Sequence, residues 1–168
     1  YAADHGLETH VARFHNVYGP LGTYDGGREK APAAMCRKVA LAPDGGEIEI
    51  WGDGEQTRSF MHINDCVDGV WRLLSSDHGG PLNLGTSRLI TINALVDLVS
   101  EIAGKKLTKR HNLEGPQGVR GRNSDNTKVH AALGWEPIVN LEEGMATSYF
   151  WIENELIKEG RLPAVASH

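Results

Sequence analysis

The chain of 168 residues has few cysteines, no long apolar run and no cationic run. Its two cysteines, Cys36 and Cys66, form no CxxC pair, so we expect reduced thiols and a cytoplasmic location. No apolar run approaches the ~20 residues that cross a bilayer, which argues against a membrane partner. The net charge is −5 and Lys/Arg runs stop at two residues, which argues against a nucleic-acid partner because phosphate backbones need a cationic stripe.

Several catalytic and cofactor motifs are also absent. The sequence has no GxGxxG fingerprint for a dinucleotide and no GxSxG nucleophile motif. Its eight histidines include no i, i+4 pair, so we expect no metal site. The chain starts at Tyr1, within what looks like the end of a helix, and we therefore expect further residues upstream.

The apolar pattern predicts an α/β protein in which several short strands are separated by helices. A buried strand is expected over 7–14, and a helix from Lys30 or Ala31 to about Ala42 with Pro32 in its first turn. The tail from Arg161 has no periodicity, so we expect one domain over 1–160 and a disordered tail over 161–168. Further expected elements are a strand over 81–84, a helix capped by Thr91 and closed by Gly104, a strand over 107–111, a loop over 115–122, a helix capped by Ser124 that ends near Leu133, and a final helix over 141–156.

The middle of the chain predicts a β-hairpin. Glu47–Trp51 alternates between polar and apolar residues, Asp53-Gly54 is a turn signal, and Thr57–Ile63 alternates again. A helix is expected to follow, with Asp65 as its N-cap.

Three short glycine-punctuated segments carry most of the candidate catalytic and ligand-binding residues. They are Arg13–Pro20, Gly26–Pro32 and Trp51–Phe60. In an acidic chain, Arg and Lys beside Gly indicate a specific phosphate or carboxylate ligand rather than a general attraction for anions.

Lys30 is the candidate acid/base group. It would lie at a helix N-terminus, where the helix dipole destabilises an ammonium group and favours proton exchange. On the residues alone, a solvated surface lysine is the more common alternative. Glu29 would either orient Lys30 or be a favourable first-turn charge, and Lys38 would either face a diphosphate or belong to an ordinary cationic helix face.

Arg58 and Arg122 are candidates to clamp one diphosphate, because a planar guanidinium binds phosphate oxygens in pairs. The alternatives are a salt bridge between Arg58 and Glu49 and a solvated loop charge at Arg122. Asn16 would donate to a ligand hydroxyl or phosphate, or only stabilise its turn. His15 and His62 are interpreted as half-buried polar positions.

Taken together and in this order, the segments 13–20, 26–34, 51–60 and 118–126 resemble the extended short-chain dehydrogenase/reductases that act on sugar nucleotides, and within them the GDP-mannose 3,5-epimerases. The segment Gly26–Pro32 is the specific one, because related epimerases and dehydratases lack its lysine. The resemblance implies the C-terminal part of a Rossmann-type enzyme, mostly its smaller substrate-binding domain.

The resemblance also implies an activity. Such an enzyme inverts C3 and C5 of GDP-mannose through a transient 4-keto sugar made by bound NAD, and it is usually a homodimer. NAD would be held mainly upstream of Tyr1, with no cofactor residue in this chain. Lys30 would be one member of the acid/base pair, whose cysteine partner matches neither Cys36 nor Cys66. The implied substrate-binding residues are Asn16, Glu29, Lys30, Ala31, Lys38, Gln56, Thr57, Arg58 and Arg122.

Two other functions remain open at this stage. One is another NAD-dependent nucleotide-sugar 4-epimerase or 4,6-dehydratase, and the other is a catalytically silent nucleotide-sugar-binding module. In each enzymatic case we expect the chain alone to be inactive.

Overall fold

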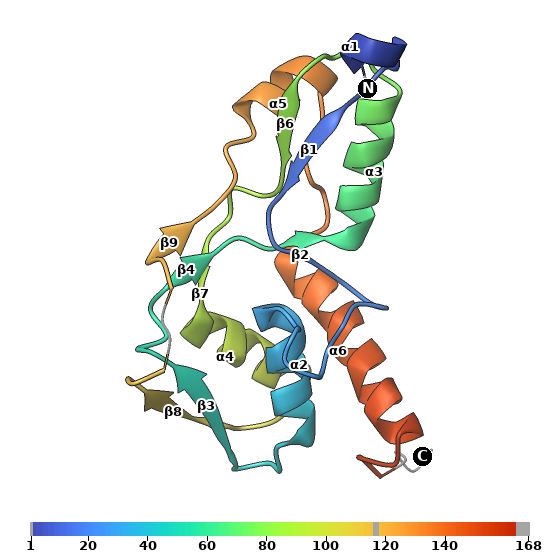
Figure 1. The fold of residues 1–168 in the computed structure, drawn as a ribbon. Helices are drawn as coiled ribbons and strands as arrows, with labels where there is room; N and C mark the ends of the chain where they lie inside the picture. Colours follow the sequence, from blue (N-terminus) through green and yellow to red (C-terminus); the bar gives the residue numbers. More distant parts are fainter. Residues whose placement is uncertain (1, 116–117, 164–168) are drawn as a thin grey trace.

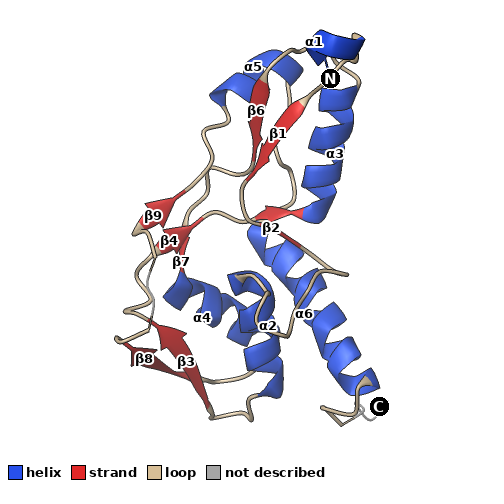
Figure 2. Ribbon diagram, viewed as in Figure 1, coloured by secondary structure: helices blue, strands red, loops and turns tan. Residues whose placement is uncertain are grey.

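The computed structural model describes residues 2–115 and 118–163 of the chain (Figure 1). It confirms the α/β prediction (Figure 2). The elements are, in chain order, α1 (Ala2–His5), β1 (Val11–Phe14), β2 (Val17–Tyr18), α2 (Ala31–Leu41), β3 (Glu47–Trp51), β4 (Thr57–Arg58), β5 (Met61–His62), α3 (Ile63–Leu74), β6 (Pro81–Leu84), β7 (Ile90–Thr91), α4 (Ile92–Ile102), β8 (Thr108–Asn112), β9 (Gly121–Arg122), α5 (Thr127–Leu133) and α6 (Leu141–Lys158).

The strands are short and pair mostly in parallel. β1 lies beside β6, β2 beside β5, and β3 beside β8, all in parallel. β4 pairs with β7 in antiparallel orientation and with β9 in parallel. Because parallel strands need crossover connections, most partners are far apart in the sequence.

One core lies where α3 and α5 accompany the β1 and β6 pair (Figure 1). Trp135 is buried against Gly69 of α3, where a Cβ atom would come within 2.9 Å of the indole ring. The indole nitrogen of Trp135 donates to Asp68 at 2.9 Å. The buried members of this core are Met61, Cys66, Leu73, Leu82, Leu84, Val129 and Trp135.

A second, larger core lies among α2, α4, α6 and β3. The helix prediction after Thr91 is confirmed, since the hydroxyl of Thr91 accepts from Ala94 N at 3.0 Å. Asn140 caps α6 in the same way, accepting from Glu143 N at 2.7 Å. Fully buried members of this core include Val39, Ile50, Leu95, Val99, Met145, Tyr149 and Leu156.

The predicted hairpin is wrong. β3 pairs with β8, and the second arm divides into β4 and β5, which belong to different sheets. Gly52 and Gly54 adopt positive φ angles of 78° and 73°, as a turn requires, but the strand that follows the turn does not pair with β3. Gly52 N donates to Asn112 O and Asn93 N donates to Gly54 O, so long-range bonds take the place of hairpin bonds.

Two predicted caps are also wrong. His62 caps α3 through Nδ1, which accepts from Asn64 N at 3.3 Å. Asp65 is instead buried and accepts from the backbone of 138 and 139. α5 begins after Asn126, while Ser124 is buried upstream of it.

The loop prediction is partly wrong, and the tail prediction stays a prediction. Gly121 and Arg122 form β9, so the loop expected over 115–122 is shorter than predicted, and 116–117 lie outside the described residues. Arg161 makes an ion pair with Asp25 at 2.7 Å. The rest of the predicted tail, 164–168, lies outside the described residues.

Both cysteines are buried and free of disulfides. Burial raises the pKa of Cys36 to about 12, which leaves its thiol protonated and unreactive near neutral pH. Within residues 2–115 and 118–163, no helix has the combination of length and apolar character that crossing a bilayer requires.

Candidate functional site

A cavity of about 350 Å³ opens where β1 ends. It brings together three residues predicted from separate segments, Asn16, Lys30 and Arg122. The remaining described residues that line it are Phe14, His15 and Val17. Two of the three glycine-punctuated segments, 13–20 and 26–32, therefore meet at this cavity, Arg122 joins them from the segment 118–126, and no residue of 51–60 is among the described lining residues.

Asn16 is fixed by the backbone around Ser59. Its φ of 45° lies in the left-handed region, which Asn tolerates better than most residues. Asn16 Nδ2 donates to Ser59 O at 3.0 Å, and Ser59 N donates to Arg122 O at 3.1 Å. Ser59 thus ties the loop after β1 to β9, and it aligns two residues of the cavity.

Lys30 is the N-cap residue of α2, and its side chain is exposed. Gly26 and Gly27 turn the preceding chain with φ angles of 88° and 82°. Lys30 also lines a neighbouring cavity of about 210 Å³, together with Tyr18 and Arg28 among others. Its amine can therefore reach a ligand in either cavity.

Glu29 holds the shape of the loop that presents Lys30. Its carboxylate accepts from Arg37 Nη2 and from Gly27 N, each at 2.7 Å. Its own backbone N–H, Arg37 and Gly27 together lower the pKa of Glu29. Glu29 is therefore an anion at neutral pH, and its charge is already paired with Arg37. Ala31 follows as the first residue of α2.

Lys38 is turned toward β3. Its Nζ donates to Glu49 O at 2.9 Å, and burial lowers the pKa of Lys38. The structure therefore gives Lys38 a structural contact and does not bring it to the cavity lined by Lys30 and Arg122.

Gln56, Thr57 and Arg58 lie at β4, next to β9. Arg58 is directly opposite Arg122 in the parallel register. Arg58 Nη1 donates to Thr57 O at 2.7 Å, while Glu49 pairs with Arg110 at 2.6 Å, so the alternative salt bridge between Arg58 and Glu49 is not formed. Gln56 is buried and donates to Trp51 O at 3.1 Å.

His15 is the cavity residue that the sequence reasoning passed over. It was interpreted only as a half-buried polar position, yet it lines the same cavity as Lys30 and Arg122. Burial and the charge of Arg122 lower the pKa of His15. Its position directly before Asn16 was the one available signal.

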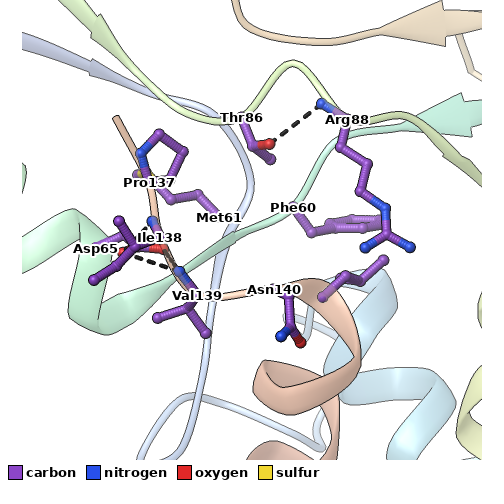
Figure 3. A pocket seen from close by; sticks show the side chains of 10 residues that line it. Phe60, Met61, Asp65, Thr86, Arg88, Pro137, Ile138, Val139 and Asn140 are labelled. Carbon is purple, nitrogen blue, oxygen red and sulfur yellow. Dashed lines mark hydrogen bonds between the residues drawn. The ribbon is translucent and has the colours of Figure 1, made fainter. Parts of the chain in front are cut away.

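A different cavity, of about 270 Å³, lies between β5, the β6–β7 connection and the start of α6 (Figure 3). Its polar groups are already engaged, because Arg88 pairs with Glu142 at 2.5 to 2.8 Å and Asp65 accepts from the backbone of Ile138 and Val139. None of the predicted site residues is among its described lining residues. We therefore take the cavity at the end of β1 as the candidate site.

Neither β1 nor β6 leads into the turn that binds a dinucleotide. A nucleotide diphosphate in a Rossmann fold sits where a strand turns through glycines directly into a helix N-terminus. Here β1 is followed by Asn16 and β2, and β6 is followed by Gly85 and β7. The cofactor-binding turn predicted to lie upstream of this chain is accordingly not supplied by either strand.

Comparison with known proteins shows which family the chain belongs to. The sequence pattern described as the NAD dependent epimerase/dehydratase family matches residues 1–85, about half of the chain. The chain belongs to this family. The resemblance inferred from the sequence motifs is thereby confirmed.

Individual members of the NAD dependent epimerase/dehydratase family match over nearly the whole chain. GDP-mannose 3,5-epimerase from Arabidopsis thaliana is 49% identical over 95% of this chain and 41% of its own length. UDP-glucose 4-epimerase from Thermotoga maritima, solved with UDP-glucose, is 32% identical with a TM-score of 0.79, covering 92% of this chain and 49% of that one.

A third family member was solved with its cofactor. UDP-glucuronic acid 4-epimerase from Bacillus cereus, in complex with UDP-glucuronic acid and NAD, is 25% identical with a TM-score of 0.77, covering 92% of this chain and 48% of that one. The chain thus spans less than half the length of each of these three relatives.

Proposed function

We propose that this chain is the nucleotide-sugar-binding portion of an isomerase that inverts C3 and C5 of GDP-mannose. The observation that carries the proposal is the cavity in which Lys30, Asn16 and Arg122 meet. These residues come from motifs of the GDP-mannose 3,5-epimerases, and the 49% identity to the Arabidopsis enzyme supports the same assignment.

The charge of the cavity suits an anionic ligand. Lys30 and Arg122 both line it, and no carboxylate is among its described lining residues. Arg58 lies on the neighbouring strand, opposite Arg122. Two guanidinium groups and an ammonium group in a chain of net charge −5 form a local cationic site, which is what a sugar diphosphate requires.

Lys30 is the residue that we propose to transfer a proton at the sugar carbon. Its side chain is exposed at the cavity, and no described residue pairs with its amine. Glu29, its neighbour, is engaged with Arg37, so the carboxylate does not neutralise Lys30. Asn16 and the arginines would hold the diphosphate while the lysine reaches the ring.

NAD use follows from the family, and we propose that NAD is bound mainly by residues outside this chain. We therefore assign to the chain only binding of the nucleotide sugar and proton transfer by Lys30. The remaining substrate contacts that we propose are Glu29, Ala31, Gln56, Thr57 and Arg58. We further propose that the enzyme acts in the cytoplasm as a homodimer and that the chain alone is inactive.

The test is hydrogen exchange at the sugar. The longest polypeptide encoded by the gene is incubated with GDP-mannose and NAD in D₂O, and deuterium at C3 and C5 is followed by NMR. We expect incorporation at both carbons, and a loss of at least about 100-fold in Lys30→Ala, as for removal of a general acid/base group. Lys106→Ala, at an exposed lysine outside the cavity, is the matched control and should exchange at the normal rate.

The outcomes separate the competing functions. Exchange that survives Lys30→Ala would remove Lys30 from the mechanism. A folded, NAD-bearing protein that binds GDP-mannose without exchange at either carbon would exclude 3,5-epimerisation and leave 4-epimerisation, dehydration or simple binding.

A further inference from the structure

A backbone hydrogen bond and close packing fix the position of His15 at the wall of the cavity. Its backbone N–H donates to Leu84 O at 3.0 Å, directly after β1. Gly85 packs so closely that an added Cβ would lie 2.7 Å from the Cβ atoms of both His15 and Ser124. The position of the His15 side chain is therefore set by packing against the end of β6 and the segment after β9.

The imidazole ring of His15 has no hydrogen-bond partner among the described residues, although the side chain is half-buried. A neutral imidazole has one nitrogen that donates and one that accepts. A polar ring that is partly removed from water gains from any partner that enters the cavity. His15 is thus able to bind a ligand without breaking an existing contact.

Charged groups reach His15 from two sides. Arg122 comes from β9 and Lys30 from the start of α2, and both line the cavity with it. From the other packed segments, the neighbours are Gly85 and Ser124, which carry no charge. Burial and Arg122 lower the pKa of His15, so the ring is neutral near neutral pH when the cavity holds no anion.

An anionic ligand changes this balance. A diphosphate bound at Arg122 offsets the positive charge of that guanidinium group and adds negative charge beside the ring. An imidazolium then donates a charge-assisted hydrogen bond to a phosphate oxygen, which is stronger than a neutral one. The required proton comes from the buffer and goes to the free ring nitrogen.

We propose that His15 is a further binding residue for the diphosphate, and that it takes up a proton when the nucleotide sugar enters the cavity. The inference rests on the proposed function, because a nucleotide sugar is the diphosphate that it names. It adds His15 to Asn16 and Arg122 as a binding group for the diphosphate, and it couples binding to pH.

The test is calorimetric titration of the full chain with GDP-mannose at pH 7 in two buffers of different ionisation enthalpy. GDP-mannose suits this test because its diphosphate is esterified at both ends, unlike a phosphate monoester, whose second pKa is about 6. We expect net uptake of about a quarter of a proton or more per ligand, since a histidine returned to its ordinary pKa of about 6.5 is about one-quarter protonated at this pH. The uptake should disappear in His15→Gln, with affinity about 10-fold lower.

The control is His130→Gln, at an exposed histidine of α5, which should keep both the uptake and the affinity. In the unmodified chain, NMR of the His15 ring protons gives an independent measurement, because GDP-mannose should raise the pH at which they titrate. This second readout does not depend on the folding of a variant.

Each outcome decides the inference. Binding without proton uptake, uptake that persists in His15→Gln, or an unchanged His15 titration would overturn it. UDP-glucose distinguishes the two proposals: His15-dependent uptake with UDP-glucose but no binding of GDP-mannose would keep the role of His15 and overturn the GDP-mannose assignment. If neither ligand binds, both proposals fail.

Discussion

Arg58 and Arg122 lie directly opposite each other on the parallel strands β4 and β9. Like charges in register on neighbouring strands repel each other and weaken the pair. The same arrangement becomes favourable when an anion lies near both guanidinium groups. The pair therefore links the stability of this part of the fold to the presence of a ligand.

The first prediction concerns this pair. Arg122→Ala should leave the melting temperature without ligand unchanged or slightly raised, because one repulsive partner is gone. Addition of GDP-mannose should then stabilise the variant less than the normal chain, since stabilisation follows ligand affinity. Thermal unfolding with and without GDP-mannose measures both effects.

The control for that experiment is Arg72→Ala on α3, where the arginine pairs with Asp68 on the surface. Its response to GDP-mannose should match that of the normal chain. An Arg122→Ala chain that is stabilised by GDP-mannose as strongly as normal would contradict a role for Arg122 in binding.

The second prediction concerns Glu29, whose side chain is 10% exposed and bound to Arg37. Glu29→Gln should lower the free energy of unfolding by about 1 kcal/mol at pH 7, because a charge-assisted bond is lost. The folded-state pKa of Glu29 is lowered, so its stabilisation is present above the ordinary glutamate pKa of about 4.3 and is lost as the pH falls through the lower folded value.

Urea unfolding at pH 7 and at pH 3 checks this dependence. The deficit of Glu29→Gln should shrink at the lower pH, whereas Glu101→Gln, at an exposed position on α4, should show no deficit at either pH. An equal deficit at both values would mean that the charge of Glu29 contributes nothing.

The third prediction concerns the packing behind His15. Gly85→Ala should cost about 1–3 kcal/mol of stability, because the new methyl group would overlap the Cβ atoms of His15 and Ser124. It should also weaken GDP-mannose binding by displacing His15. Gly79→Ala is the matched control, since a Cβ there meets no atom within 4 Å. Urea unfolding and calorimetry would measure the two effects, and equal behaviour of both variants would rule out the packing argument.

The fourth prediction concerns Asp65, which is 4% exposed. Its carboxylate accepts from Ile138 N at 3.0 Å and Val139 N at 3.1 Å, just before α6. Asp65→Ala should destabilise the chain by about 2–3 kcal/mol, because backbone donors lose a charged acceptor. Asp77→Ala, at an exposed position, should stay within about 0.5 kcal/mol of the normal chain. A similar loss in both, measured by chemical unfolding, would mean that Asp65 has no special structural role.

Local signals were sufficient to predict much of the fold. The helices α2, α4 and α6 and the strands β6 and β8 lie close to their predicted positions, because their apolar periodicity and turn residues act over a few positions. The prediction for β1 is partly wrong, since the strand covers only Val11–Phe14 and is mostly exposed instead of buried. The hairpin failed because the partner of Glu47–Trp51 is Thr108–Asn112, a pairing that no local pattern encodes. The prediction that Asp65 caps a helix is wrong for the same reason, since its carboxylate oxygens accept hydrogen bonds from backbone N–H groups more than 70 positions away.

The site was predicted in a similar, partial way. Asn16, Lys30 and Arg122 were chosen separately, and the structure brings them into one cavity. Lys38 was chosen by helical spacing, but its amine satisfies a carbonyl of β3. His15 was missed because its importance depends on the approach of Arg122, which comes from pairing between β4 and β9.

The two hydrogen bonds through Ser59 have a consequence for how this site can vary between species. Both bonds use the backbone of Ser59, its carbonyl to Asn16 and its N–H to Arg122. The side chain at this position is fully buried and its hydroxyl has no hydrogen-bond partner among the described residues, so a small apolar side chain would serve as well. Evolution can therefore exchange one small residue for another at position 59 without disturbing the alignment of Asn16 with Arg122.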